Sequence, residues 1–137
     1  MPKVTISNIN GLVQKAGSGM TVNSPLYLGD GQTETLGDNG SIPVTASYVK
    51  VDAGGGNRTG IRFGGTGTAG QILIVHNAGG EELRFHNTAG TSLLRGVVDD
   101  NDTMETMGTY MFVSDGAQWC YIGGAQASNV TGLTAGS

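Results

Sequence analysis

The chain has 137 residues, of which 25 are glycine, three are proline and 13% are charged. This length suits one domain with a sizeable core, and the Gly-, Thr-, Ser- and Asn-rich composition favours turns and short strands over long helices. The net charge of −4 and the scatter of the seven Lys and Arg residues argue against a nucleic-acid-binding surface.

Membrane and secretory classes are also disfavoured. No apolar run is long enough to span a membrane, and the first residues lack the apolar stretch of a signal peptide. Cys120 is the single cysteine, so no internal disulfide is expected, and synthesis in a reducing cytoplasm fits. We expect Cys120 to be a buried or half-buried strand residue. The alternative, a catalytic thiol, is disfavoured because no histidine lies near Cys120 in the sequence.

The first 40 residues carry only short apolar bursts separated by Gly, Ser and Asn. Bursts this short offer too little apolar surface to offset the ordering of the backbone, which costs ~1–2 kcal/mol per residue. We therefore expect residues 1–40 to form an extended arm that becomes ordered on another surface. Its candidate contact residues are Val4, Ile6, Leu12, Val13, Leu26 and Leu28.

Residues 41–125 show a regular pattern of short strand-like runs. These runs recur about every 8 to 12 residues, with turn-forming residues between them, and no helical periodicity is sustained. The pattern predicts an all-β body: an antiparallel, jelly-roll-like sandwich or barrel of about eight short strands. Residues 126–137 form a polar C-terminal tail.

The segment Gly65–Gly70 reads GTGTAG and matches the G-x-G-x-x-G fingerprint of dinucleotide-binding proteins. In that motif the phosphate sits on the N-terminus of a following helix. Here the β-branched run 71–76 follows instead, so the glycines are expected to be turn residues with positive φ, and no cofactor is expected.

Metal ligands are sparse. If the segment NAGG closed a hairpin between residues 71–76 and 82–86, His76 and His86 would lie roughly 13 Å apart, too far to share one ion. The alternative is a metal site on a threefold axis, to which each of three chains contributes the same histidine. An acidic loop with Asp99, Asp100, Asp102 and Glu105 offers oxygen ligands, but it departs from the EF-hand pattern, so a solvated loop is favoured.

Catalytic signatures are missing: there is no G-x-S-x-G, H-E-x-x-H or Walker A sequence. We therefore expect no enzyme. The aromatic residues on 110–113 and 119–122 are expected to pair as a hairpin joined by a turn and to anchor the sheet, with a ligand-binding tryptophan as the alternative. The candidates for the core or for a trimer axis are Ile72, Ile74, Leu83, Phe85, Phe112 and Trp119.

Two stretches carry a resemblance to a known group of proteins. YMFVSDGAQWCYIGG (110–124) resembles the closing hairpin of virion β proteins of tailed bacteriophages, and GTAGQILIVHNAGGEELRFHN (67–87) looks similar to the same group. The resemblance covers about residues 42–124 and leaves out the arm. It is more specific for a trimeric virion β protein than for a place on the virion.

The resemblance implies a structural function. A small β body with an arm suits a capsid cement (decoration) protein, which would bind the major capsid protein on the outer shell as a homotrimer, after synthesis in the host cytoplasm. The alternative is a head-fibre or tail-fibre module that binds a host receptor or glycan. Neither nucleic acid nor a membrane is expected as a direct partner.

Overall fold

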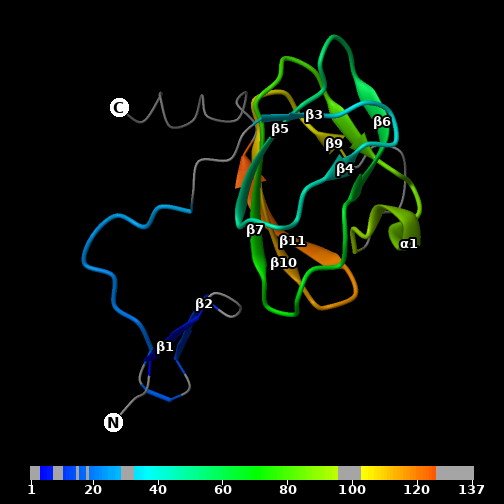
Figure 1. Ribbon diagram of the computed structural model, residues 1–137. Helices are drawn as coiled ribbons and strands as arrows, with labels where there is room; N and C mark the ends of the chain where they lie inside the picture. Colours follow the sequence, from blue (N-terminus) through cyan, green and yellow to red (C-terminus); the bar gives the residue numbers. More distant parts are fainter. Residues whose placement is uncertain are drawn as a thin grey trace.

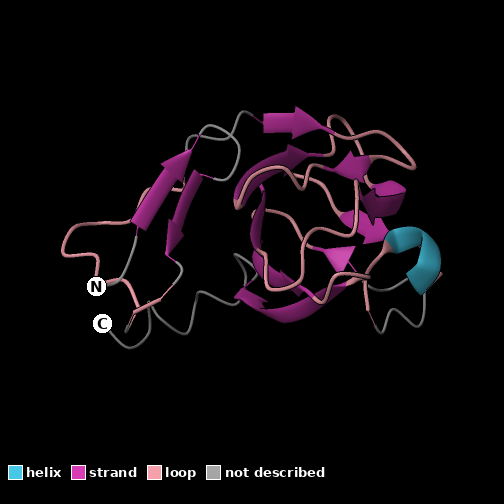
Figure 2. Cartoon of the chain, turned by 60° about the horizontal axis from the view of Figure 1, so that its bottom comes forward, coloured by secondary structure: helices cyan, strands magenta, loops and turns pink. Residues whose placement is uncertain are grey.

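The computed structural model describes residues 4–7, 11–14, 16–17, 19–28, 33–95 and 103–125. In this part of the chain nearly all regular structure is β, with one short helix, α1 (Ala89–Ser92). Two sheets lie face to face and enclose the core (Figures 1 and 2). The expectation of a mostly β, sandwich-like body is confirmed. No helix among the described residues has the length and hydropathy that a membrane crossing needs.

The larger sheet has five strands in the order β11-β10-β7-β5-β3, and the smaller has four in the order β4-β6-β8-β9. We call them the large and the small sheet. The strands of the large sheet are β3 (Thr33–Thr35), β5 (Tyr48–Asp52), β7 (Ile72–Asn77), β10 (Thr109–Ser114) and β11 (Trp119–Ala125). Those of the small sheet are β4 (Ser41–Ile42), β6 (Arg58–Phe63), β8 (Leu83–Phe85) and β9 (Thr103–Met104).

From β3 to β8 the chain alternates between the two sheets, one strand at a time. Consequently β3, β5 and β7 are parallel neighbours in the large sheet, and β4, β6 and β8 are parallel neighbours in the small one. The antiparallel pairs in the two sheets are those of β10 with β7 and β11, and of β9 with β8. Both sheets are therefore mixed, and the expected antiparallel arrangement is wrong for the pairs β3–β5, β5–β7, β4–β6 and β6–β8.

The hairpin considered between residues 71–76 and 82–86 does not form. β7 pairs with β5 and β10, whereas β8 pairs with β6 and β9 in the other sheet. The connection begins at Asn77, a fully buried residue whose Nδ2 donates to the carbonyls of Glu81 at 2.8 Å and Glu105 at 3.0 Å. The NAGG segment therefore carries the chain from one sheet to the other. The distance of roughly 13 Å between His76 and His86 assumed the hairpin, so it no longer applies.

The aromatic hairpin does form, as β10 and β11. Phe112 lies opposite Tyr121 and Ser114 opposite Trp119. Phe63 of the small sheet packs between the rings of Phe112 at 5.0 Å and Trp119 at 5.5 Å. The inner faces of both sheets thus share one aromatic cluster, which favours their association through apolar burial and ring contacts.

Four of the six candidates for the core or trimer axis are buried in this core: Leu83, Phe85, Phe112 and Trp119. Ile72 is 48% exposed and Ile74 is half-buried, because Leu73 and Val75 are the residues of β7 that face inward. The run ILIV is apolar in both phases of a strand, so its sequence could not say which phase meets the core. Ile72 and Ile74 therefore lie outside the core of the single chain, and the trimer axis stays the predicted place for both.

The arm contains the antiparallel hairpin of β1 (Val4–Ser7) and β2 (Gly11–Gln14), which stands apart from the body in both views (Figures 1 and 2). Residues 19–28 have no strand or helix and are exposed. β3 lies inside the segment assigned to the arm, yet it pairs with β5, and Leu36 after it is 4% exposed in the core. Among the described residues, strand pairing with the body therefore begins at Thr33.

Candidate functional site

The side of the large sheet that faces away from the core is apolar over one half and polar over the other, where Lys50, His76 and Thr109 lie side by side. Met111 lies opposite Ile74, and Val113 lies opposite Ile72 on one side and Cys120 on the other. Ile72 is 48% exposed and Met111 is 37% exposed, whereas Ile74, Val113 and Cys120 are half-buried. Cys120 is a free thiol. We call this surface the apolar outer face; it consists of Tyr48, Ile72, Ile74, Met111, Val113 and Cys120.

The apolar outer face continues to β11, the edge strand of the large sheet. A register shift in the β10–β11 pairing leaves Ile122 as the extra residue of a β-bulge, and its side chain is 54% exposed. Tyr121 lies on the other side of the sheet, because it pairs with the buried Phe112; it is 52% exposed although its ring contacts Phe112 and Tyr110 at centroid distances of 5.7 and 6.2 Å. Exposed apolar side chains at the end of a sheet are typical of a surface that another chain covers.

The arm carries the second group of exposed apolar residues. Leu26 and Leu28, two of the candidates for capsid binding, are 67% and 38% exposed. Neighbouring members of this group are Met20, Val22 and Tyr27. The remaining candidates, Val4, Ile6, Leu12 and Val13, lie on the β1–β2 hairpin, and their side chains are outside the described structure.

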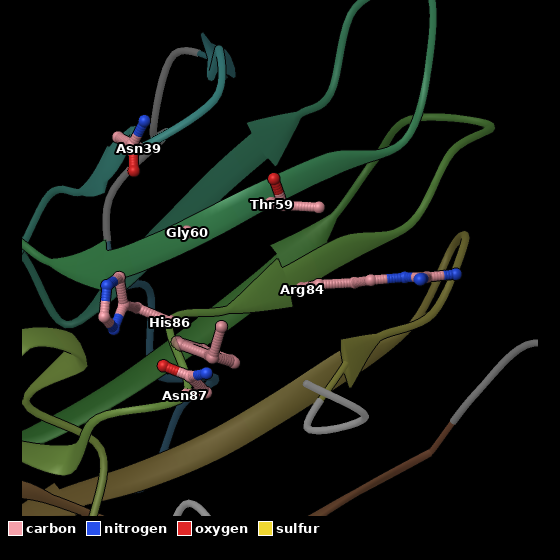
Figure 3. A pocket seen from close by; sticks show the side chains of 7 residues that line it. Asn39, Thr59, Gly60, Arg84, His86 and Asn87 are labelled. Carbon is pink, nitrogen blue, oxygen red and sulfur yellow. The ribbon is translucent and has the colours of Figure 1, made fainter. Parts of the chain in front are cut away.

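A polar hollow of about 440 Å³ opens on the small sheet (Figure 3). Its side chains come from the turn before β4, from β6, and from β8 with the two residues after it: Asn39, Thr59, Gly60, Arg84, Phe85, His86 and Asn87. Sequence reasoning missed this hollow, because its members are far apart in the chain. The alternation of buried Leu83 and Phe85 with Arg84 and His86 was the one available signal.

The hollow holds donors and acceptors and no catalytic pair. Arg84 is paired with Glu82 at 2.9 Å, so its charge is already balanced. The Nδ1 atom of His86 accepts the backbone N–H of Thr88 at 3.2 Å, which leaves the proton of a neutral ring on Nε2. Amide, hydroxyl and imidazole groups of this kind suit hydrogen bonds to hydroxyl or carboxylate groups of a small ligand.

Among the described residues no group of three His, Cys, Asp or Glu side chains could hold a metal ion. His76 lies on the large sheet, where Nδ1 is 2.9 Å from Oγ1 of Thr109, and His86 lies in the hollow of the small sheet. Of the acidic-loop candidates, Asp99, Asp100 and Asp102 fall outside the described residues. Glu105 is described, and its backbone N–H donates to the Tyr110 hydroxyl at 2.8 Å.

The GTGTAG segment is a turn between β6 and β7, as expected. Gly67 and Gly70 have φ values of +69° and +85°, a region that glycine adopts without steric cost. β7 follows the segment, where a phosphate-binding motif needs a helix. The carbonyl of Gly65, the first residue of the segment, accepts the indole N–H of Trp119 at 2.8 Å, so this loop closes over the core.

Comparisons with known proteins give little. No protein-family model matches the chain, and no curated protein matches it. A solved structure described as a chaperone–substrate complex aligns with 89% of this chain at 14% identity and a TM-score of 0.43. The chain spans only 20% of the length of that protein.

Proposed function

We propose that this chain is a structural protein of a tailed-bacteriophage particle: a capsid cement protein that sits as a homotrimer on the outer shell. The proposal is supported by the resemblance of residues 42–124 to virion β proteins. The structural observation that carries it is the distribution of exposed apolar side chains. Among the described residues they gather in the arm and along the large sheet, with Met107 as the exception.

The two groups suit two kinds of contact. The apolar outer face, centred on Ile72, Ile74 and Met111, is the proposed contact between copies, because burying it removes apolar surface from water. The arm is the proposed attachment to the major capsid protein. Three arms that bind together raise the apparent affinity well above that of one arm, provided that the trimer matches a threefold point of the shell.

Binding to shells tests this proposal. Purified chain is added to capsids that lack their endogenous decoration protein, and the particles are examined by co-sedimentation and cryo-electron microscopy. We expect added density at the threefold or quasi-threefold points of the shell. We also expect decorated shells to withstand heating better than undecorated shells. Folded chain that stays in the supernatant with every shell tested would refute the cement function.

The polar hollow on the small sheet favours a second candidate, a head-fibre or tail-fibre module that binds a host glycan. Its amide, hydroxyl and imidazole groups match the hydroxyl and carboxylate groups of sugars. Glycan-array binding separates the two candidates. A saturable signal that Asn87→Ala removes would favour the fibre module, whereas the cement protein requires shell binding that Asn87→Ala leaves intact.

A further inference from the structure

β11 differs from the other edge strands of the two sheets. β3 has three residues, and β4 and β9 have two each, whereas β11 has seven and contains no charged residue and no proline. Short length, charge and proline are the usual ways in which proteins protect sheet edges from further pairing. In the described part of the chain, β11 is therefore the edge that lacks all three protections.

In the part of the chain that the structure describes, the outer edge of β11 is occupied at its start. Leu94 bridges Trp119, and the backbone N–H of Arg95 donates to the carbonyl of Trp119 at 2.9 Å. Beyond this point no described segment pairs with the edge. On the face of the sheet, a β-carbon built on Gly123 would meet no atom within 4 Å, so the space for a side chain there is also open. Glycine inside a strand often marks a place where another backbone approaches closely. Among the described residues, the stretch from Tyr121 to Ala125 therefore has no partner strand on its outer edge, and the side chains of Tyr121 and Ile122 beside it are exposed.

The arm supplies a segment of matching chemistry. Residues 19–28 contain no charged side chain, and Leu26, Tyr27 and Leu28 are exposed and consecutive. In an extended strand Leu26 and Leu28 share one face and Tyr27 occupies the other. Pro25 has no N–H, so a paired strand begins after it. Both surfaces are uncharged and apolar, which favours a dry contact.

The length of the arm decides which copy it reaches. β3 and β11 are the opposite edges of the large sheet, so a strand added outside β11 lies five strand spacings from β3, about 24 Å along the sheet. Leu28 is five residues before Thr33, and these residues span at most about 17 Å. The core and the small sheet block a shorter path. Leu28 therefore falls short of the β11 edge of its own chain.

We propose that residues 26–28 of one copy add as an extra strand to the outer edge of β11 of a neighbouring copy. Each copy donates one arm and accepts another, a head-to-tail exchange that closes into a ring. The proposal deepens the proposed function, on whose homotrimer it rests. It assigns Leu26 and Leu28 to the contact between copies and leaves the β1–β2 hairpin for the shell.

Cysteine cross-linking tests the exchange once the single native cysteine, Cys120, is replaced by serine, because Gly123→Cys then places one thiol on the free stretch of β11. In this background Leu26→Cys, Tyr27→Cys and Leu28→Cys are oxidised one at a time, with the same variants lacking Gly123→Cys as controls. We expect covalent oligomers that need the cysteine at position 123 and that alternate with position: either 27 cross-links, or 26 and 28 do. Equal cross-linking at all three positions would refute a strand, and internal cross-links within one chain would refute the exchange.

Charge substitutions give an independent measurement. Leu26→Asp combined with Leu28→Asp, and separately Ile122→Lys, should weaken self-association by roughly a hundredfold or more, because each change opposes burial of apolar surface. Met107→Lys changes a residue that is 53% exposed outside both surfaces, and it should leave association unchanged. Sedimentation equilibrium measures association, and circular dichroism checks the fold.

The outcomes separate this inference from the proposed function. A parent chain that is trimeric, with unaltered association in the arm and Ile122 variants, refutes the exchange and leaves the trimer standing. Cross-linked rings that do not bind shells support the exchange and refute the cement function. A parent chain that is monomeric at micromolar concentration refutes both.

Discussion

Gly67 lies directly against the indole of Trp119: a β-carbon on Gly67 would sit 2.6 Å from Cζ2 of that ring. Trp119 is fully buried and also bonded to the carbonyl of Gly65. The second glycine of the GTGTAG segment is therefore needed for close approach to a core side chain. The fingerprint is explained by packing between a loop and an aromatic residue.

Gly67→Ala should destabilise the protein by about 2–4 kcal/mol, since the new methyl group meets the indole and alanine is strained at a positive φ. Gly70→Ala is the matched control, because Gly70 also has a positive φ but has open space around its missing side chain. It should cost only about 1 kcal/mol. Urea denaturation measures both; equal losses would mean that contact with Trp119 contributes nothing.

Trp119→Ala should cost about 3–5 kcal/mol, because it leaves a large cavity between the sheets. Trp119→Phe keeps an aromatic ring beside Phe63 but loses the bond to Gly65, so its cost should be smaller. Thermal melts followed by near-ultraviolet circular dichroism provide the measurement. An unchanged melting temperature for Trp119→Ala would contradict the core role and revive the ligand-platform alternative.

Asn77→Ala should destabilise the protein by about 2–3 kcal/mol, since the carbonyls of Glu81, Met104 and Glu105 all lose a donor in a buried place. Asn77→Asp should be worse at neutral pH, because a carboxylate then faces these carbonyls, and it should recover partly in acid. Asn57→Ala, which removes an exposed acceptor for the backbone N–H of Glu82, is the control with a small expected effect. Chemical denaturation at neutral and at acidic pH measures the free energy of unfolding of each variant and tests these expectations.

The pKa of Asp115 is lowered from 3.8 to about 2, first by the backbone N–H groups of Gln118 and Ala117 and then by Arg95, to which its carboxylate is hydrogen-bonded. A carboxyl with a depressed folded-state pKa stabilises the fold above about pH 4 and loses this contribution as the pH falls toward 2. Asp115→Asn should therefore flatten the dependence of stability on pH in that window.

Arg95→Gln separates the two causes of this shift. Because the backbone donors come first, the pKa of Asp115 should stay well below its ordinary value in this variant. Carboxyl titration by nuclear magnetic resonance measures it directly. A return to the ordinary value in Arg95→Gln would show that the ion pair, and not the turn, controls the titration.

Local signals in the sequence predicted the parts of the fold that depend on local contacts. The β10–β11 hairpin is one, because Asp115 accepts backbone N–H groups within its own turn. The parallel pairs of β5 with β7 and of β6 with β8 join strands more than 20 residues apart, and no turn chemistry reports such partners. Regular strand spacing was therefore interpreted as hairpins where the chain passes from sheet to sheet.

Of the candidate surfaces, too, the sequence predicts some, whereas others depend on how distant strands pair. The apolar bursts of the arm are visible in the sequence, and Leu26 and Leu28 are indeed exposed. The apolar outer face was not visible as such, because Ile72 and Leu73 look alike until pairing fixes the phase of β7. The polar hollow needed three separate segments to be placed in space.

The boundary between arm and body provides the last prediction. Deletion of residues 2–28 should leave the β body folded with nearly unchanged urea stability of the single chain, because the described contacts of the body begin at Thr33. Deletion of residues 2–38 should destabilise it by several kcal/mol: it removes β3 and the buried Leu36, whose backbone N–H donates to the carbonyl of Asp52 at 2.7 Å. Circular dichroism and hydrogen exchange of β5 compare the two truncations. If both fold equally well, β3 contributes nothing to the sheet and the body starts after residue 38; if the shorter deletion already unfolds the chain, the arm is part of the body.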